Sequence, residues 1–173
     1  TALESHKATG ILLKTLSYGE SYLIVTFNNR KFGKPGERQG RQKKQEALAN
    51  VFEPFSLTDL IFSRKNNNSL AFIESCDIID HYTLIRQDLE KTLTASYFID
   101  LADHFSQEGK SGDRLFALLN DFLTWLSHEN VSDAAVRFFE MRLLKIAGFE
   151  PSLTACVRCK TPVANGVSYY FLA

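Results

Sequence analysis

Two hydrophobic periods divide the chain near residue 81. Before that point, short runs of apolar, β-branched and aromatic residues alternate with turn residues, a pattern that is typical of β-strands. We predict four strands, at residues 11–16, 22–27, 57–63 and 70–76. The first two strands flank a glycine-containing turn and form a predicted hairpin. Short strands at this spacing predict a small β-barrel.

After His81, apolar residues recur every third or fourth position, as they do in amphipathic helices. The first predicted helix carries the apolar series Ile85, Leu89, Leu93, Tyr97, Phe98, Leu101 and Phe105. A second helix runs from about residue 115 to 126, and a third from the N-cap Ser132 to Gly148. Because the third helix is apolar more than halfway round, we expect it to be central in a helical bundle. The predicted fold class is therefore α+β, with a barrel domain at 1–81 and a helical domain at 82–151.

The remaining residues, 152–173, resemble the start of a zinc-binding element. Cys156 and Cys159 have C-x-x-C spacing, and a predicted strand follows them. A structural zinc site takes four ligands, and a second pair is not in this sequence. A redox pair would instead be expected after a strand and at the start of a helix, whereas this pair follows a predicted helix and precedes a predicted strand. Zinc is therefore favoured over a redox role or chance spacing. Cys76 ends a predicted strand and is expected to be a buried, hydrophobic-like residue.

A basic stretch from residue 30 to 44 is the strongest functional signal. Its glycines and its proline predict a loop with no regular element, and the near absence of apolar side chains means that it cannot bury itself. We therefore expect it to be solvated or to bind a polyanion, with phosphate as the obvious group. Its seven basic residues are candidate DNA-binding residues: Arg30, Lys31, Lys34, Arg38, Arg41, Lys43 and Lys44.

The overall net charge of zero conceals this asymmetry. Without the basic stretch the chain has 13 basic and 19 acidic residues, so an acidic body carries one basic loop. Small barrels bind single strands with a charged groove and aromatic platforms. Tyr18, Tyr22 and Phe32 are near enough in sequence to stack on bases, although packing in the core or hairpin is the commoner role for such residues. A solvated loop that binds nothing is the alternative interpretation.

Other classes of protein receive little support from the sequence. No run of about 18 apolar residues predicts a membrane span, and the N-terminal residues do not resemble a signal peptide. An odd number of cysteines argues against a disulfide framework and favours the cytoplasm. The four histidines have neither metal-ligand nor triad spacing, and His104 is expected to be a core residue. We therefore predict that the chain is not an enzyme.

The helical domain offers a second candidate surface. Arg137, Arg142 and Lys145 lie along one predicted helix beside aromatic residues. Basic residues beside an apolar groove can dock an acidic peptide that has a hydrophobic end. A solvated helix face is the alternative for each of these residues.

Taken in order, these elements resemble the bacterial RecO family of DNA repair and recombination mediators. The resemblance rests on Tyr18-Gly19-Glu20-Ser21-Tyr22-Leu23, on Phe52-Glu53-Pro54-Phe55, on Arg137-Phe138-Phe139-Glu140 through Gly148, and on Cys156-Val157-Arg158-Cys159. It covers nearly the whole chain, and it is carried by the order and spacing of the segments.

The resemblance implies an N-terminal OB-fold, a helical domain and an inserted zinc element. It implies binding of single- and double-stranded DNA, annealing of complementary strands, and loading of recombinase onto DNA coated by single-strand-binding protein. The implied partners are RecR and the acidic, Phe-ending tail of single-strand-binding protein, which would dock on the helical domain with Arg137. A cytoplasmic, nucleoid-associated location follows from the same resemblance.

The sequence departs from the family pattern in two places. Pro35-Gly36-Glu37 replaces an apolar strand that the family carries before its basic cluster, so only four of five barrel strands are readable. The family also continues beyond Ala173, to a second cysteine pair. We therefore expect residues to be missing from the sequence within the loop, with backbone breaks between residues 28 and 50, and after residue 173.

Overall fold

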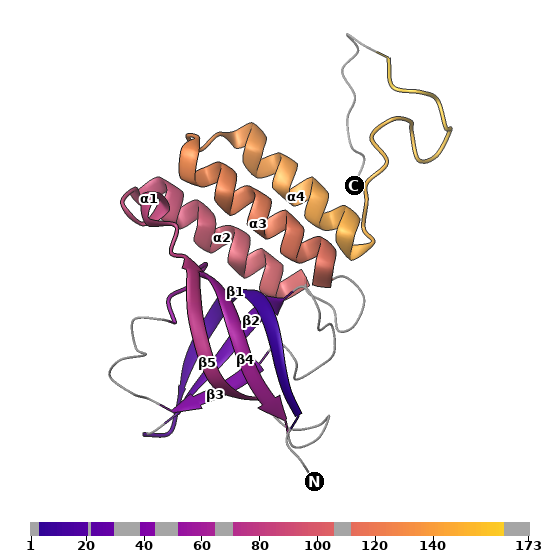
Figure 1. The fold of residues 1–173 in the computed structure, drawn as a ribbon. Helices are drawn as coiled ribbons and strands as arrows, with labels where there is room; N and C mark the ends of the chain where they lie inside the picture. The colour runs from indigo at the N-terminus through magenta and orange to yellow at the C-terminus, as the bar shows by residue number, and fades with distance from the viewer. Residues whose placement is uncertain are drawn as a thin grey trace.

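The computed structural model describes residues 4–20, 22–29, 39–43, 52–64, 71–105 and 112–164, and the statements below concern these residues. A β-barrel occupies the N-terminal part and helices cover one end of it (Figure 1). The strands are β1 (Glu4–Tyr18), β2 (Tyr22–Asn29), β3 (Gln39–Lys43), β4 (Leu57–Arg64) and β5 (Ala71–Asp80). The helices are α1 (Thr83–Arg86), α2 (Leu89–Phe105), α3 (Gly112–His128) and α4 (Asp133–Ala147).

The strands close into a barrel in the order β1-β2-β3-β5-β4. Neighbouring strands are antiparallel, except that β3 and β5 are parallel. A five-stranded barrel with this order is compatible with an OB-fold. The four predicted strands are confirmed, but β1 begins earlier, at Glu4, and β5 continues to Asp80.

The fifth strand, β3, corrects the prediction that the basic stretch contains no regular element. Its sequence, Gln39-Gly40-Arg41-Gln42-Lys43, has no large apolar residue, yet it pairs with β2 on one side and with β5 on the other. Backbone hydrogen bonds supply this pairing and need no apolar side chain. Gly40 lies opposite the fully buried Val25, at an inward position of the sheet. Backbone breaks were expected between residues 28 and 50, and of this range residues 30–38 and 44–50 lie outside the described residues.

Strand β1 is buried on both of its faces where the chain reads Ile11-Leu12-Leu13. Leu12 lies in the barrel interior with Val25 and other residues of β1, β2, β4 and β5. Ile11 and Leu13 belong to the core of the helical domain. A continuous apolar run is the pattern of a strand that is covered on both sides. The barrel and the helices therefore share β1 as a common wall.

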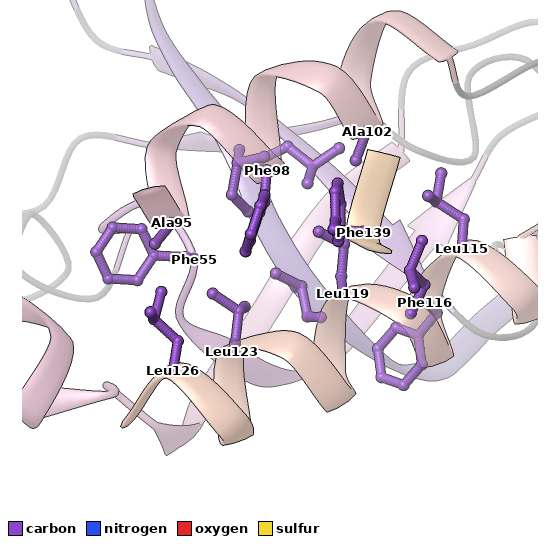
Figure 2. Packing of buried hydrophobic residues seen from close by; sticks show 14 of the residues in the cluster. Phe55, Ala95, Phe98, Ala102, Leu115, Phe116, Leu119, Leu123, Leu126 and Phe139 are labelled. Carbon is purple, nitrogen blue, oxygen red and sulfur yellow. The ribbon is translucent and has the colours of Figure 1, made fainter. Parts of the chain in front are cut away.

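The helices form two layers above the barrel. Helices α2 and α3 contact β1, and α3 also contacts β2, while α4 packs on α2 and α3 without comparable contact to the barrel. Phe98 of α2 and Phe139 of α4 are stacked with their ring centroids 4.0 Å apart (Figure 2). The expectation that the third predicted helix is central is wrong, because α4 buries only Phe139 and Leu143 fully, whereas α3 buries six residues.

The first predicted helix is two helices, with a break at Gln87 and Asp88. Its predicted apolar face is also partly wrong. Leu89 is 75% exposed and Leu93 is 61% exposed, while the buried residues of α2 are Ala95, Phe98, Ile99 and Ala102. Contacts with α3 and β1 bury this side of α2, so Leu89 and Leu93 lie on its solvent side.

Both predicted ends of α4 are confirmed. The hydroxyl of Ser132 accepts a hydrogen bond from the Ala135 amide at 3.3 Å, as an N-cap residue does. Gly148 has a φ of 85°, the left-handed conformation in which glycine ends helices at least cost.

Arg86, at the end of α1, joins the helices to the barrel. Its guanidinium donates hydrogen bonds to the carbonyls of His81 at 2.7 Å and Pro54 at 2.8 Å. It also pairs with Glu53 at 3.0 Å and lies 4.3 Å from the ring centroid of Phe55. Burial lowers the pKa of Arg86, although the Glu53 carboxylate opposes that shift. Arg86 thus holds the segment Phe52-Glu53-Pro54-Phe55 against the helical domain, together with the burial of Phe55 in the helical core.

Replacing Arg86 by leucine is expected to lower the free energy of unfolding by about 2–4 kcal/mol, because two carbonyls and one carboxylate lose their partner. Arg86→Lys keeps the charge but cannot make the same set of bonds, so it should recover only part of the loss. Urea denaturation followed by the fluorescence of Trp125 measures both. Lys145→Met, which removes an ion pair between two exposed side chains, is the control and should leave the midpoint unchanged. An unchanged midpoint for Arg86→Leu would contradict the role of this side chain.

Candidate nucleic-acid interface and helical groove

The outer face of β1, β2 and β3 combines aromatic, apolar and basic positions near the hairpin turn. Directly paired residues share one face of a sheet. Between β1 and β2, Leu16 pairs with Ile24 and Tyr18 pairs with Tyr22. Between β2 and β3, Ile24 pairs with Arg41 and Tyr22 pairs with Lys43. We call this set, together with Lys14, the hairpin face: Lys14, Leu16, Tyr18, Tyr22, Ile24, Arg41 and Lys43.

On the hairpin face the β1 side chains Lys14, Leu16 and Tyr18 are exposed, while Tyr22 and Ile24 of β2 are half-buried. Tyr18 is 58% exposed and Leu16 is 57% exposed. The alternate residues Leu23 and Val25 pack inside the barrel, so the pleat itself points their neighbours outward. Gly19 begins the turn with a φ of 62°, a conformation that glycine adopts without steric cost.

The structure brings two of the seven candidate DNA-binding residues into ordered positions. Arg41 and Lys43 lie on β3, at register positions beside Ile24 and Tyr22. The other five, Arg30, Lys31, Lys34, Arg38 and Lys44, lie outside the described residues, as does Phe32. Sequence reasoning missed Lys14, which is exposed on the same face of β1 and pairs with Thr26. Its signal was the alternation Lys14, Leu16, Tyr18, which places these residues on one side of a strand.

A groove of about 460 Å³ lies between α3 and α4. Three basic residues line it, Arg114 from α3 and Arg142 and Lys145 from α4, and Leu118 and Ile146 add apolar surface. Asp121 is the acidic member of the lining. Two of the three residues that we predicted for partner binding therefore meet at one groove. Arg114 was missed because it lies beside, and not within, the apolar series that predicts α3.

Arg137, the third predicted partner-binding residue, does not line this groove. Its guanidinium pairs with the Glu140 carboxylate, with the shortest distance 2.6 Å. The Tyr97 hydroxyl donates to the same carboxylate at 2.5 Å, and this bond is the main cause of the raised pKa of Tyr97. Burial opposes ionisation of Glu140, but the bonds from Tyr97 and Arg137 outweigh it and lower its pKa. Arg137 is thus engaged on the side of α4 that faces α2.

On the other side of α4, aromatic residues extend the surface near the groove. The Phe138 ring lies 5.8 Å from the Arg142 guanidinium and 6.1 Å from the Phe122 ring centroid. Phe138 is 57% exposed, so most of it faces solvent. A basic, partly apolar groove with an exposed aromatic residue beside it is the combination that the sequence predicted for peptide docking.

The cysteine pair lies in a tight turn after α4. The Lys160 amide donates to the Cys156 carbonyl at 3.0 Å, and an isolated β-bridge joins Ala155 to Pro162. Both thiols are exposed, and a hydrogen bond from Thr161 is the main cause that lowers the pKa of Cys159 to about 7. A low pKa favours the thiolate, which is the form that binds metal. The two side chains could supply two of the four ligands of a zinc site.

Within the ranges that the structure describes, no group of three His, Cys, Asp or Glu side chains is arranged to hold a metal ion. His104 is exposed on α2, and its Nδ1 lies 2.8 Å from the Asp100 carbonyl, so the prediction of a core histidine is wrong. Cys76 is buried as predicted, and burial raises its pKa to about 11. No helix among the described residues is long and apolar enough to span a membrane.

The fold defines an α+β protein in which an OB-like barrel is joined to a helical bundle. Residues 3–82 match the family model for the N-terminal part of recombination protein O, and residues 86–172 match the model for its C-terminal part. The chain is 46% identical to the DNA repair protein RecO of Syntrophus aciditrophicus over 168 aligned residues, and these cover 96% of this chain.

Two further relatives with the same name come from Anaeromyxobacter dehalogenans and Halalkalibacterium halodurans. They are 30% and 32% identical over 165 residues, which cover 95% and 94% of this chain. The chain belongs to the RecO family. It spans about 65% of the length of these relatives.

The three thiols are expected to differ sharply in reactivity. In zinc-free folded protein, alkylation of Cys159 should rise as the pH passes 7 and then level off, because its thiolate is then fully formed. Cys76 should stay unmodified at pH 8, because it is buried and its pKa is about 11. Mass spectrometry of peptides after iodoacetamide treatment measures each site.

Protein unfolded in urea is the control, in which all three thiols should react. Equal rates for Cys76 and Cys159 in the folded protein would contradict the structure. Protection of both Cys156 and Cys159 by added zinc, with no change at Cys76, would support a metal site.

Proposed function

We propose that this protein acts in DNA repair and homologous recombination without being an enzyme. It binds single- and double-stranded DNA, anneals complementary strands, and helps to load recombinase onto DNA coated by single-strand-binding protein. The hairpin face carries this proposal, because OB-folds bind oligonucleotides on the face formed by strands 2 and 3 and on adjacent loops. Membership of the RecO family supports the same role.

The mechanism of annealing is electrostatic. Basic residues on β3 and in the stretch around it neutralise phosphates on two strands and so reduce their mutual repulsion. Complementary bases can then approach and pair, and no nucleotide hydrolysis is needed. The acidic remainder of the chain repels DNA and confines it to the basic side.

The α3–α4 groove supports a role in partner binding. Its three cations match an acidic peptide, and its apolar lining with Phe138 matches a hydrophobic end. The acidic, Phe-ending tail of single-strand-binding protein has this chemistry, and RecR is a second proposed partner. Docking of the tail would bring the barrel to DNA that single-strand-binding protein already covers.

A second candidate function rests on the same groove. The protein could be an adaptor in which the helical domain does all the binding and the basic stretch has no direct role in DNA contact. Zinc, held in part by Cys156 and Cys159, would in either case stabilise the segment after α4. The two functions differ in whether the isolated protein binds naked DNA.

Changing Arg38, Arg41, Lys43 and Lys44 together to glutamate is expected to weaken DNA binding and to flatten its dependence on salt. Each lost phosphate contact on a single strand should reduce the slope of log affinity against log salt by about 0.7. Fluorescence anisotropy of labelled single-stranded DNA at several salt concentrations measures both quantities.

A single charge reversal gives a matched control. Lys43→Glu lies on the hairpin face, whereas Lys7→Glu lies where β1 pairs with β4, beside Asp59. Only Lys43→Glu should lose affinity. Unchanged affinity of the fourfold variant at low salt would favour the adaptor.

Arg142→Glu is expected to weaken binding of an acidic peptide ending in phenylalanine by about 10-fold, because it reverses a charge in the groove. Its affinity for naked DNA should stay close to that of the unchanged protein. Isothermal titration with a synthetic peptide and the anisotropy assay measure the two effects.

Arg137→Ala tests the residue that the family resemblance singles out. Weaker binding of the peptide by this variant would extend the docking site around α4 to Arg137. Lys91→Glu, on α2 outside the groove, is the control for charge and should bind the peptide normally. Normal peptide binding by Arg142→Glu would show that the groove is not the docking site.

A further inference from the structure

Tyr18 occupies an unusual place for a large aromatic residue. It ends β1 directly before the turn, and it is 58% exposed although its strand continues into two hydrophobic cores. Burial of an aromatic ring stabilises a fold substantially, so packing does not explain why a tyrosine stands here. Its position on the hairpin face offers another explanation.

The surroundings of Tyr18 match the chemistry of a nucleotide. Leu16 lies two residues earlier on the same face and Tyr22 lies directly opposite on β2. Cations flank this surface, with exposed Lys14 on β1 and the register positions of Arg41 and Lys43 on β3. Glu20, in the turn, is the only acidic residue between positions 14 and 29. A flat apolar ring beside cations accommodates a base together with its phosphate.

We infer that Tyr18, supported by Tyr22, stacks on unpaired bases and makes the hairpin face discriminate single-stranded from double-stranded DNA. This inference rests on the proposed DNA-binding function and adds a specificity-determining residue to it. In a duplex the faces of the bases are already stacked on one another, so only phosphates remain for the cations. In a single strand both the phosphates and the base faces are available.

Stacking and charge neutralisation leave different experimental signatures. Neutralisation depends on salt and is the same for any strand with the same number of phosphates. Stacking requires a base, and its loss weakens binding without changing the number of phosphates that are contacted. An abasic strand separates the two, because it keeps every phosphate and lacks the rings.

The experiment compares three labelled probes of equal length by fluorescence anisotropy: oligothymidine, an abasic strand and a duplex. The unchanged protein should bind oligothymidine about 5- to 100-fold more tightly than the abasic strand. Tyr18→Leu should lose most of this advantage and keep the same salt slope and the same affinity for the duplex. Tyr18→Trp, which keeps an aromatic face, should retain it.

The outcomes are distinguishable. Equal affinity of the unchanged protein for oligothymidine and the abasic strand overturns the inference, and this arm needs no variant to fold. Normal oligothymidine binding by Tyr18→Leu also overturns the role of this residue. Failure of the unchanged protein to bind any of the three probes would instead overturn the proposed DNA-binding function.

Discussion

The burial of β1 on both faces is the constraint on which the rest of this structure depends. Leu12 closes the barrel from inside, while its neighbours Ile11 and Leu13 enter the helical core. Because neither core is complete without this strand, the barrel and the helices cannot be positioned independently. Arg86 reinforces the same junction by fastening the segment before β4 to α1.

The shared wall also separates two surfaces with different chemistry. Towards the helices, the outward positions of β1 and β2 are covered, whereas towards the hairpin turn they are open and flanked by cations. The groove lined by Arg114, Arg142 and Lys145 lies elsewhere, between α3 and α4. An arrangement of this kind allows a nucleic acid and an acidic peptide to bind one molecule without competing for the same cations.

Strand β3 shows how a segment of polar residues can be ordered without a core of its own. Its side chains are polar or absent, so it gains little from burial, and its order comes from hydrogen bonds to β2 and β5. Basic residues are thereby placed at fixed register positions instead of in a free loop. Fixed positions lose less conformational entropy on binding than a flexible chain does, which favours affinity for phosphate.

The capping residues Ser132 and Gly148 marked both ends of α4, and hydrophobic periodicity by itself determined the four apolar strands, the helical region and the burial of Cys76. It did not reveal β3, because pairing between backbones leaves no trace in side-chain polarity. The predicted apolar face of α2 and the expected central place of α4 were wrong for a related reason. Which side of a helix is buried depends on its neighbours, and only tertiary packing brought α3 between the barrel and α4. The same packing decided the sites. Arg114 of α3 and Arg142 of α4 line the same groove. Tyr18 of β1 and Lys43 of β3 both pair with Tyr22 of β2. Such distances in sequence are closed only by the fold.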